Sequence, residues 1–219
     1  MHMGKARNFL PPVRLTCWAA GMISLLLVDL IAQVRGQSPN LTESSRQAEA
    51  TNLQHEYNVK AAFLYSFGRY VEWPKDAFEE RSGAFVVGIF GEDPFEQILD
   101  RIAQSKTIQG RRIVIQKMAS IEEMQTCHIL FVSHSVSPAQ HDAIINKMRD
   151  KPTLLVGETP GFAEHGGGLN FFLEGGTVRF EINVEAIRQK MLIIDAKLLN
   201  LGKKVPEAES GQDKKSNGM

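Results

Sequence analysis

The stretch AFVVGIFG, residues 84–91, is a short apolar run rich in β-branched and aromatic side chains, which predicts a β-strand. The segment after it, DPFEQILDRIAQS (93–105), opens on Asp93 and Pro94, a pair typical of a helix start. Apolar side chains then recur at helical spacing, which predicts a helix over 93–105. A strand followed by a helix is the repeating unit of an α/β fold.

The same alternation continues along the chain. Apolar runs predict strands at RRIVIQKM (111–118), HILFVS (128–133) and PTLLVGE (152–158). A capping box predicts a short helix at SIEEMQTC (120–127), and a Ser-Pro start predicts a longer helix over 137–150. Strands that are apolar throughout and separated by helices indicate a parallel sheet that is buried on both faces.

The pattern changes after residue 168. The segments LNFFLE (169–174) and TVRFEIN (177–183) read as two strands, and Gly175-Gly176 between them predicts a tight hairpin turn. One or two helical segments follow up to Gly202. The predicted fold is therefore α/β: three layers around a mostly parallel sheet, with an antiparallel C-terminal hairpin at one edge.

An aromatic segment, AAFLYSFGRYVEWP (61–74), precedes the first strand and belongs to a helix predicted over 53–73. Phe63, Phe67 and Tyr70 lie on one face of that helix, which predicts that they pack into the core. Trp73 stands directly before Pro74, which ends the helix. Because tryptophan is rarely fully buried, we expect Trp73 to be available for contact with a partner.

The N-terminus has the composition of a secretory signal peptide. A basic region precedes the uncharged run LTCWAAGMISLLLV (15–28), and small residues follow it, so cleavage after Ala32 or Gly36 fits. The run is short for a membrane span, although an uncleaved segment that anchors the protein to the inner membrane is the alternative. Both predict that the rest of the chain is exported.

The composition divides the chain into four parts. We predict a signal peptide at 1–36, a flexible spacer at 37–52, one α/β domain at 53–202 and a disordered tail at 203–219. The formal net charge is zero and no basic stripe is present, which argues against nucleic-acid binding. Without the signal peptide, Cys127 is the single cysteine, so no internal disulfide is expected. We expect it to be buried, with intermolecular pairing as the alternative.

Ligands of open α/β sheets bind at the carboxyl ends of the parallel strands. Glu92, Ser133 and Glu158 follow three of the predicted strands and are our candidates for a ligand crevice. The sequence has no G-x-S-x-G elbow, no H-E-x-x-H, no C-x-x-C and no phosphate-binding glycine loop leading into a helix. We therefore expect no catalytic residues, no metal and no cofactor, and hence a binding protein rather than an enzyme.

Five blocks of the chain resemble, in order, the YfiR/HmsC family of periplasmic regulators. They are VKAAFLYSFGRYVEWP (59–74), VGIFGEDPFEQIL (87–99), CHILFVS (127–133), GGGLNFFLEGGTVRFEINVEA (166–186) and IDAKLLNLG (194–202). The resemblance implies an α/β domain in the periplasm that binds the sensor domain of an inner-membrane diguanylate cyclase. Such binding keeps the cyclase inactive and lowers cyclic-di-GMP signalling and biofilm formation.

The resemblance further implies an outer-membrane lipoprotein that sequesters the regulator, and dimers in some members. It does not extend to redox control. The best-known members carry disulfides, whereas Cys127 is the single cysteine of this chain outside the predicted signal peptide. We expect the partner surface to include Trp73, Phe162, Asn170 and Phe172. The alternative function is a periplasmic module that binds a small ligand without enzymatic activity, in the crevice near Glu92, Ser133 and Glu158.

Overall fold

The computed structural model describes residues 41–81 and 83–206, so the predicted signal peptide at 1–36 lies outside the described residues. The chain divides into two units, Met1–Glu49 and Ala50–Met219. Helix α2 (Leu41–Tyr70) begins within the first unit, where the side chains of residues 43–49 are exposed. The prediction of a flexible spacer up to residue 52 is therefore wrong from Leu41 onward. Alanine, glutamine, glutamate and arginine favour a helix even where nothing packs against it.

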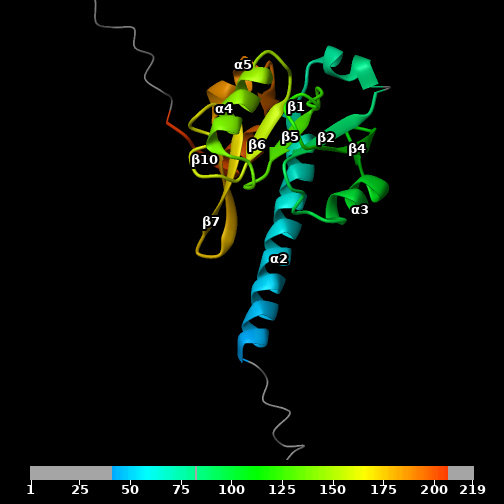
Figure 1. Cartoon of the computed structure of the whole chain (residues 1–219). Coiled ribbons are helices and arrows are strands. Elements are labelled where there is room, and N and C mark those ends of the chain that lie inside the picture. The colour runs from blue at the N-terminus through cyan, green and yellow to red at the C-terminus, as the bar shows by residue number, and fades with distance from the viewer. Residues whose placement is uncertain (1–40, 82, 207–219) are drawn as a thin grey trace, which may run out of the picture. The chain divides into compact units, whose positions relative to one another are not determined.

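The sheet and all other described elements belong to the second unit (Figure 1). After α2, the elements follow in this order: β1 (Val71–Glu72), η1 (Lys75–Arg81), β2 (Phe85–Phe90), α3 (Ile98–Ser105), β3 (Thr107–Ile108), β4 (Arg111–Met118), β5 (Ile129–Val132), α4 (Pro138–Lys147), β6 (Leu154–Gly157), β7 (Leu169–Glu174), β8 (Thr177–Ile182), α5 (Val184–Gln189), β9 (Ile193–Ile194), α6 (Ala196–Leu201) and β10 (Lys203–Lys204).

One eight-stranded sheet carries the fold, in the order β10-β8-β7-β6-β5-β2-β4-β3. Strands β4, β2, β5, β6 and β7 pair in parallel, while β7–β8 and β3–β4 pair antiparallel. The prediction of an α/β fold with a mostly parallel sheet is confirmed. The predicted place of the β7–β8 pair at the edge of the sheet is wrong, because β10 pairs with β8 and forms that edge. Lys203–Lys204 is thus a strand rather than the start of a disordered tail, and 207–219 lies outside the described residues.

The sheet is buried on both faces, as the apolar strands predict. In β5, Ile129 and Phe131 belong to one hydrophobic cluster, whereas Leu130 and Val132 belong to another. Successive side chains of a strand point to opposite faces, so this split places one core on each side of the sheet. The first core includes Phe67 of α2, which stacks on Phe171 of β7. The aromatic side chains of this helix are therefore mainly core material.

One predicted helix end, one predicted helix start and one whole predicted helix are wrong. Helix α2 ends at Tyr70 rather than at residue 73, because the chain continues into β1, which pairs with β9. Helix α3 begins at Ile98 rather than at Asp93, whose carboxylate accepts a hydrogen bond from the Phe95 amide in a turn before the helix. Residues 120–127 form no helix, although the Ser120 hydroxyl accepts the Glu123 amide as a capping box would.

The other predicted elements agree with the structure. Helix α4 starts after Ser137 with Pro138 at its first position, and Gln140 completes a capping box. Strands β7 and β8 meet at Gly175 and Gly176, whose φ angles are 58° and 78°. Backbone with positive φ at both central residues suits the right-handed twist of the flanking strands and favours glycine.

Candidate functional site

The carboxyl ends of three neighbouring parallel strands form the base of the candidate site. Strand β2 ends at Phe90, β5 at Val132 and β6 at Gly157, and these strands are adjacent in the sheet. Polar residues follow within two positions of each strand end: Glu92 after β2, His134 after β5 and Glu158 after β6. Parallel pairing brings these residues to the same end of the sheet, where α/β proteins bind their ligands.

Glu158 forms a nearly buried ion pair with Lys60 of helix α2. The side chains of Glu158 and Lys60 are 2% and 6% exposed, and 2.7 Å separates the Lys60 Nζ from the Glu158 Oε2. Lys60 also contacts the carboxylate of Glu56, one helical turn earlier, at 2.5 Å. A buried carboxylate needs such a partner, because burial of an unpaired charge costs several kcal/mol. The pair thus ties helix α2 to the end of β6.

The second oxygen of Glu158 faces His134 and Tyr57. The Glu158 Oε1 accepts the backbone amide of His134 at 2.9 Å and lies 3.0 Å from its Nδ1. Tyr57 donates its hydroxyl to the same oxygen at 3.4 Å. Burial and the negative charge of Glu158 raise the pKa of the Tyr57 phenol, so the phenol stays protonated and remains a donor. We call these five residues, Glu56, Tyr57, Lys60, His134 and Glu158, the Glu158 cluster.

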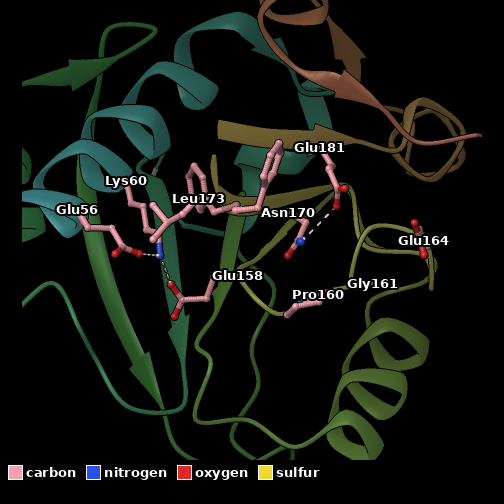
Figure 2. A pocket seen from close by; sticks show the side chains of 11 residues that line it. Glu56, Lys60, Glu158, Pro160, Gly161, Glu164, Asn170, Leu173 and Glu181 are labelled. Carbon is pink, nitrogen blue, oxygen red and sulfur yellow. Dashed lines mark hydrogen bonds and ion pairs between the residues drawn. The ribbon is translucent and has the colours of Figure 1, made fainter. Parts of the chain in front are cut away.

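A cleft of about 670 Å³ opens beside this cluster (Figure 2). It exists because β7 pairs with β6 only at Leu169 and Asn170, whereas the pairing of β7 with β8 continues to Glu174. We call it the acidic cleft, because four of the residues that line it are glutamates. Its lining consists of Glu56, Lys60, Glu158, Pro160, Gly161, Glu164, Asn170, Phe171, Phe172, Leu173 and Glu181.

The three residues that we predicted as a ligand crevice do not line one cavity together. Glu158 lines the acidic cleft, as predicted for a residue at a strand end. Ser133 is fully buried, and its hydroxyl interacts with that of Ser135 rather than with a cavity. Glu92 is exposed, and its backbone amide bonds to the Ser135 hydroxyl. Ser133 and Glu92 are thus part of a turn, which corrects the predicted crevice.

Two of the four predicted partner residues are core residues. Trp73 is 8% exposed, packs edge-on against Phe85 and donates its Nε1 hydrogen to the His128 carbonyl at 3.2 Å. Phe162 is 2% exposed and packs in the core that includes α4. The expected exposure is wrong because the sequence does not show that β1 and η1 carry Trp73 back over the sheet. Neither side chain offers a partner more than a small surface.

The other two predicted partner residues line the acidic cleft. Asn170 is 1% exposed and lies between strands β6 and β8. Phe172 is half-buried, and the ammonium group of Lys203 lies 5.7 Å from the centre of its ring. Both predicted residues therefore lie in the wall of a cleft rather than on a flat surface.

Sequence reasoning missed Tyr57 and Lys60. Both lie on the buried face of α2, because Tyr57 is four residues before the core residue Ala61 and Lys60 is four residues before the core residue Leu64. A lysine on the apolar face of a helix, four residues after a glutamate, is a signal that could have indicated a buried ion pair. The sequence also gave no sign of the exposed apolar side chains of Met191, Ile193 and Leu201.

The polar side chains at the strand ends bond mainly to one another. The Ser133 hydroxyl accepts a hydrogen bond from the Ser135 hydroxyl at 3.3 Å, whereas the Nδ1 of the neighbouring His134 faces the Glu158 carboxylate at 3.0 Å. Among the described residues, no three His, Cys, Asp or Glu side chains lie close enough together to hold a metal ion. In the described part of the chain, we also find no helix with the length and apolar character that a membrane crossing requires.

The fold and the site define a mixed α/β domain with a ligand-sized cleft at the ends of its parallel strands. In a comparison with known protein families, residues 57–203 match the YfiR/HmsC-like family. The match covers well over half of the chain, and the chain belongs to the YfiR/HmsC-like family. A search of the curated proteins found no match. Membership in this regulatory, non-catalytic family suggests a periplasmic regulator of diguanylate cyclase signalling.

Proposed function

We propose that this protein binds the periplasmic sensor domain of an inner-membrane diguanylate cyclase and holds the enzyme inactive. The observation that carries the proposal is the family match over residues 57–203, which includes every strand of the large sheet except the last residue of β10. Binding inhibits only if the protein prefers the inactive arrangement of the cyclase, because equal affinity for both arrangements shifts neither population. The result is less cyclic-di-GMP and less biofilm.

The exposed apolar residues at the C-terminal end of the domain are the surface that we assign to this partner. Met191, Ile193 and Leu201 are 61%, 65% and 64% exposed. Met191 and Ile193 lie on either side of a buried residue, Leu192, so they point away from the core on the same short segment. Exposed large apolar side chains that gather on one segment are typical of protein contact surfaces.

A capture experiment tests this surface. Purified protein is added to detergent-solubilised membranes of the native cell, and the captured material is assayed for conversion of GTP to cyclic-di-GMP. We expect the wild-type protein to capture cyclase, and the double variant Met191→Ser/Ile193→Ser to capture about thirtyfold less, because two such contacts of about 1 kcal/mol each contribute about 2 kcal/mol together. Leu53→Ser is the matched control, since Leu53 is also 55% exposed but lies on α2.

Equal capture by the wild type and the double variant would remove the assignment of the surface. No capture by any form would count against the function itself.

The family resemblance also leads us to propose an outer-membrane lipoprotein that sequesters the protein, and a homodimer, as further partners. Light scattering of the purified protein tests the homodimer directly.

The acidic cleft favours a second function, that of a periplasmic module that binds a small ligand. Its volume of about 670 Å³ lies in the range of small-molecule sites. Only Glu158 of the predicted crevice residues lines it, together with residues of α2, β7 and β8. Thermal unfolding with a metabolite library tests this function, because a ligand at 100 times its Kd adds about 2.7 kcal/mol to the free energy of unfolding.

A further inference from the structure

We propose that the acidic cleft binds a small organic cation, a linear aliphatic ammonium ion such as a polyamine. This inference goes beyond the inhibitory role proposed above and does not require it. Four glutamates and one lysine line the cleft, so its formal charge is negative (Figure 2). The lysine, Lys60, is already engaged by two of the glutamates, Glu56 and Glu158. Glu164 and Glu181 line the other side of the cleft, away from Lys60 (Figure 2).

An unsatisfied acceptor in the wall of the cleft points to the same chemistry. Asn170 is 1% exposed, and its Oδ1 has no hydrogen-bond partner. The Asn170 amide nitrogen donates to the Glu181 Oε2 at 3.4 Å. This bond fixes the orientation of the Asn170 amide group, because a flipped amide would place its oxygen, an acceptor, against the carboxylate oxygen of Glu181, which is also an acceptor. Figure 2 shows the amide oxygen turned into the space between Glu158 and Pro160. A ligand that donates a hydrogen bond there would satisfy it.

The shape and the remaining surroundings of the cleft favour an organic cation over a metal ion. The glutamates stand apart on α2, β8 and two positions of the loop after β6, and no three acidic or histidine side chains of the described residues converge on one point. Phe171, Phe172 and Leu173 give the cleft an apolar wall, along which methylene groups can pack. Lys203 lies 3.9 Å from Glu181, but its side chain is 71% exposed, so it neutralises this carboxylate only weakly.

Calorimetric titration of the purified, full-length protein tests the proposal without any partner protein. The probe is spermidine at low ionic strength, and 1,8-octanediol, which has a similar length but no charge, is the comparison. We expect spermidine to bind with one site and the diol not to bind. Binding should weaken as salt is added, because the attraction is electrostatic.

Two substitutions at one position give opposite expectations. Asn170→Leu removes the acceptor and should weaken spermidine binding about tenfold, the value of one buried hydrogen bond to a charged group. Asn170→Asp places a second carboxylate beside Glu181 and should strengthen it. Glu164→Gln should weaken binding, whereas Glu174→Gln is the matched control, since Glu174 is exposed and does not line the cleft. Circular dichroism verifies that each variant is folded.

Failure of the proposal is distinct from failure of the inhibitory function, because no cyclase is present in the titration. Equal binding of spermidine and the diol, or no binding of spermidine, would overturn it. An equal loss of affinity in Glu174→Gln and Asn170→Leu would show that spermidine binds outside the cleft, and would overturn the proposal as well. Binding of a hexalysine peptide without binding of spermidine would assign the cleft to a basic protein segment instead.

Discussion

Lys60 and Glu158 are the residues on which the geometry of the site depends most. One lies on α2 and the other directly after β6, 98 positions apart in the sequence, and both side chains are nearly buried. Without Lys60, the carboxylate of Glu158 would be buried without a cation, which is costly. Tyr57 and His134 support the pair by hydrogen bonds to the same carboxylate.

Substitution of Lys60 by methionine should therefore destabilise the fold strongly. It keeps the length of the side chain but leaves Glu158 buried without its cation, so we expect the free energy of unfolding to fall by about 3 kcal/mol. Urea unfolding measures the change. The control is Lys117→Met, which breaks an ion pair with Asp93 where the lysine is 57% exposed, and should cost less than about 1 kcal/mol. Similar losses in the two variants would contradict the importance of the buried pair.

The residue scale also shows where sequence reasoning fails. Trp73 was assigned to a contact surface because it stands at the end of a helix before a proline, yet the helix ends three residues earlier. The ring then packs on Phe85 and bonds to the His128 carbonyl. Burial of this kind depends on the pairing of β1 with β9, about 120 positions further along the chain, and local sequence patterns contain no information on such pairing.

Trp73→Phe tests the role of Trp73 as a core residue. The variant loses one buried hydrogen bond and part of the packing, so the free energy of unfolding should fall by about 2 kcal/mol. Capture of cyclase activity, measured per folded molecule, should stay at the wild-type level. A loss of capture in a variant of unchanged stability would restore Trp73 as a contact residue.

At the scale of elements, the central strands could be predicted from the sequence and several helix limits could not. Strands β2, β4, β5 and β6 lie within the predicted ranges. Strands β2, β5 and β6 are buried on both faces and therefore apolar throughout, whereas β4 is only partly buried and carries polar residues. The early start of α2 was missed because its first turns are exposed and polar, so they show no apolar period. The capping box at residues 120–123 stabilises only a turn, since no apolar helical face follows it.

A buried lysine that follows α5, Lys190, contacts the C-terminal end of helix α4. The ammonium group of Lys190 donates to the Met148 carbonyl and lies 3.4 Å from the Arg149 carbonyl. Such carbonyls after the last turn of a helix carry partial negative charge and attract a cation. Burial lowers the pKa of Lys190 from 10.5 to about 8, although the charge of Asp150 partly opposes the shift.

This lowered pKa predicts how stability depends on pH. Between about pH 8 and 10.5 the unfolded chain binds more protons than the folded protein, so the free energy of unfolding gains a contribution that rises with pH. Above pH 10.0, the ordinary pKa of tyrosine, Tyr57 lowers the free energy of unfolding as pH rises, because its pKa is raised and the folded protein keeps a proton that the unfolded chain has lost. Urea unfolding between pH 8 and 10 should therefore show a rise that is absent in Lys190→Met. Parallel curves for both proteins would contradict the prediction.

At the scale of the whole molecule, the fold class, the order of the central elements and the family followed from the sequence. The candidate site followed only in part: Glu158, Asn170 and Phe172 line the cleft, whereas Trp73, Phe162, Ser133 and Glu92 do not. A site assembled from α2, the end of β6 and the β7–β8 pair depends on contacts between distant segments. Such contacts are set by tertiary packing, which local periodicity does not specify.

The central claim, that the protein restrains a diguanylate cyclase from the periplasm, has one direct test. The gene is deleted in the native cell, and cyclic-di-GMP is measured in the deletion strain and after complementation. The account predicts that cyclic-di-GMP rises on deletion and returns to the wild-type level with the full-length gene, but not with a form that lacks residues 1–36 and is not exported. Unchanged cyclic-di-GMP in every growth condition, or restoration by the non-exported form, would contradict it.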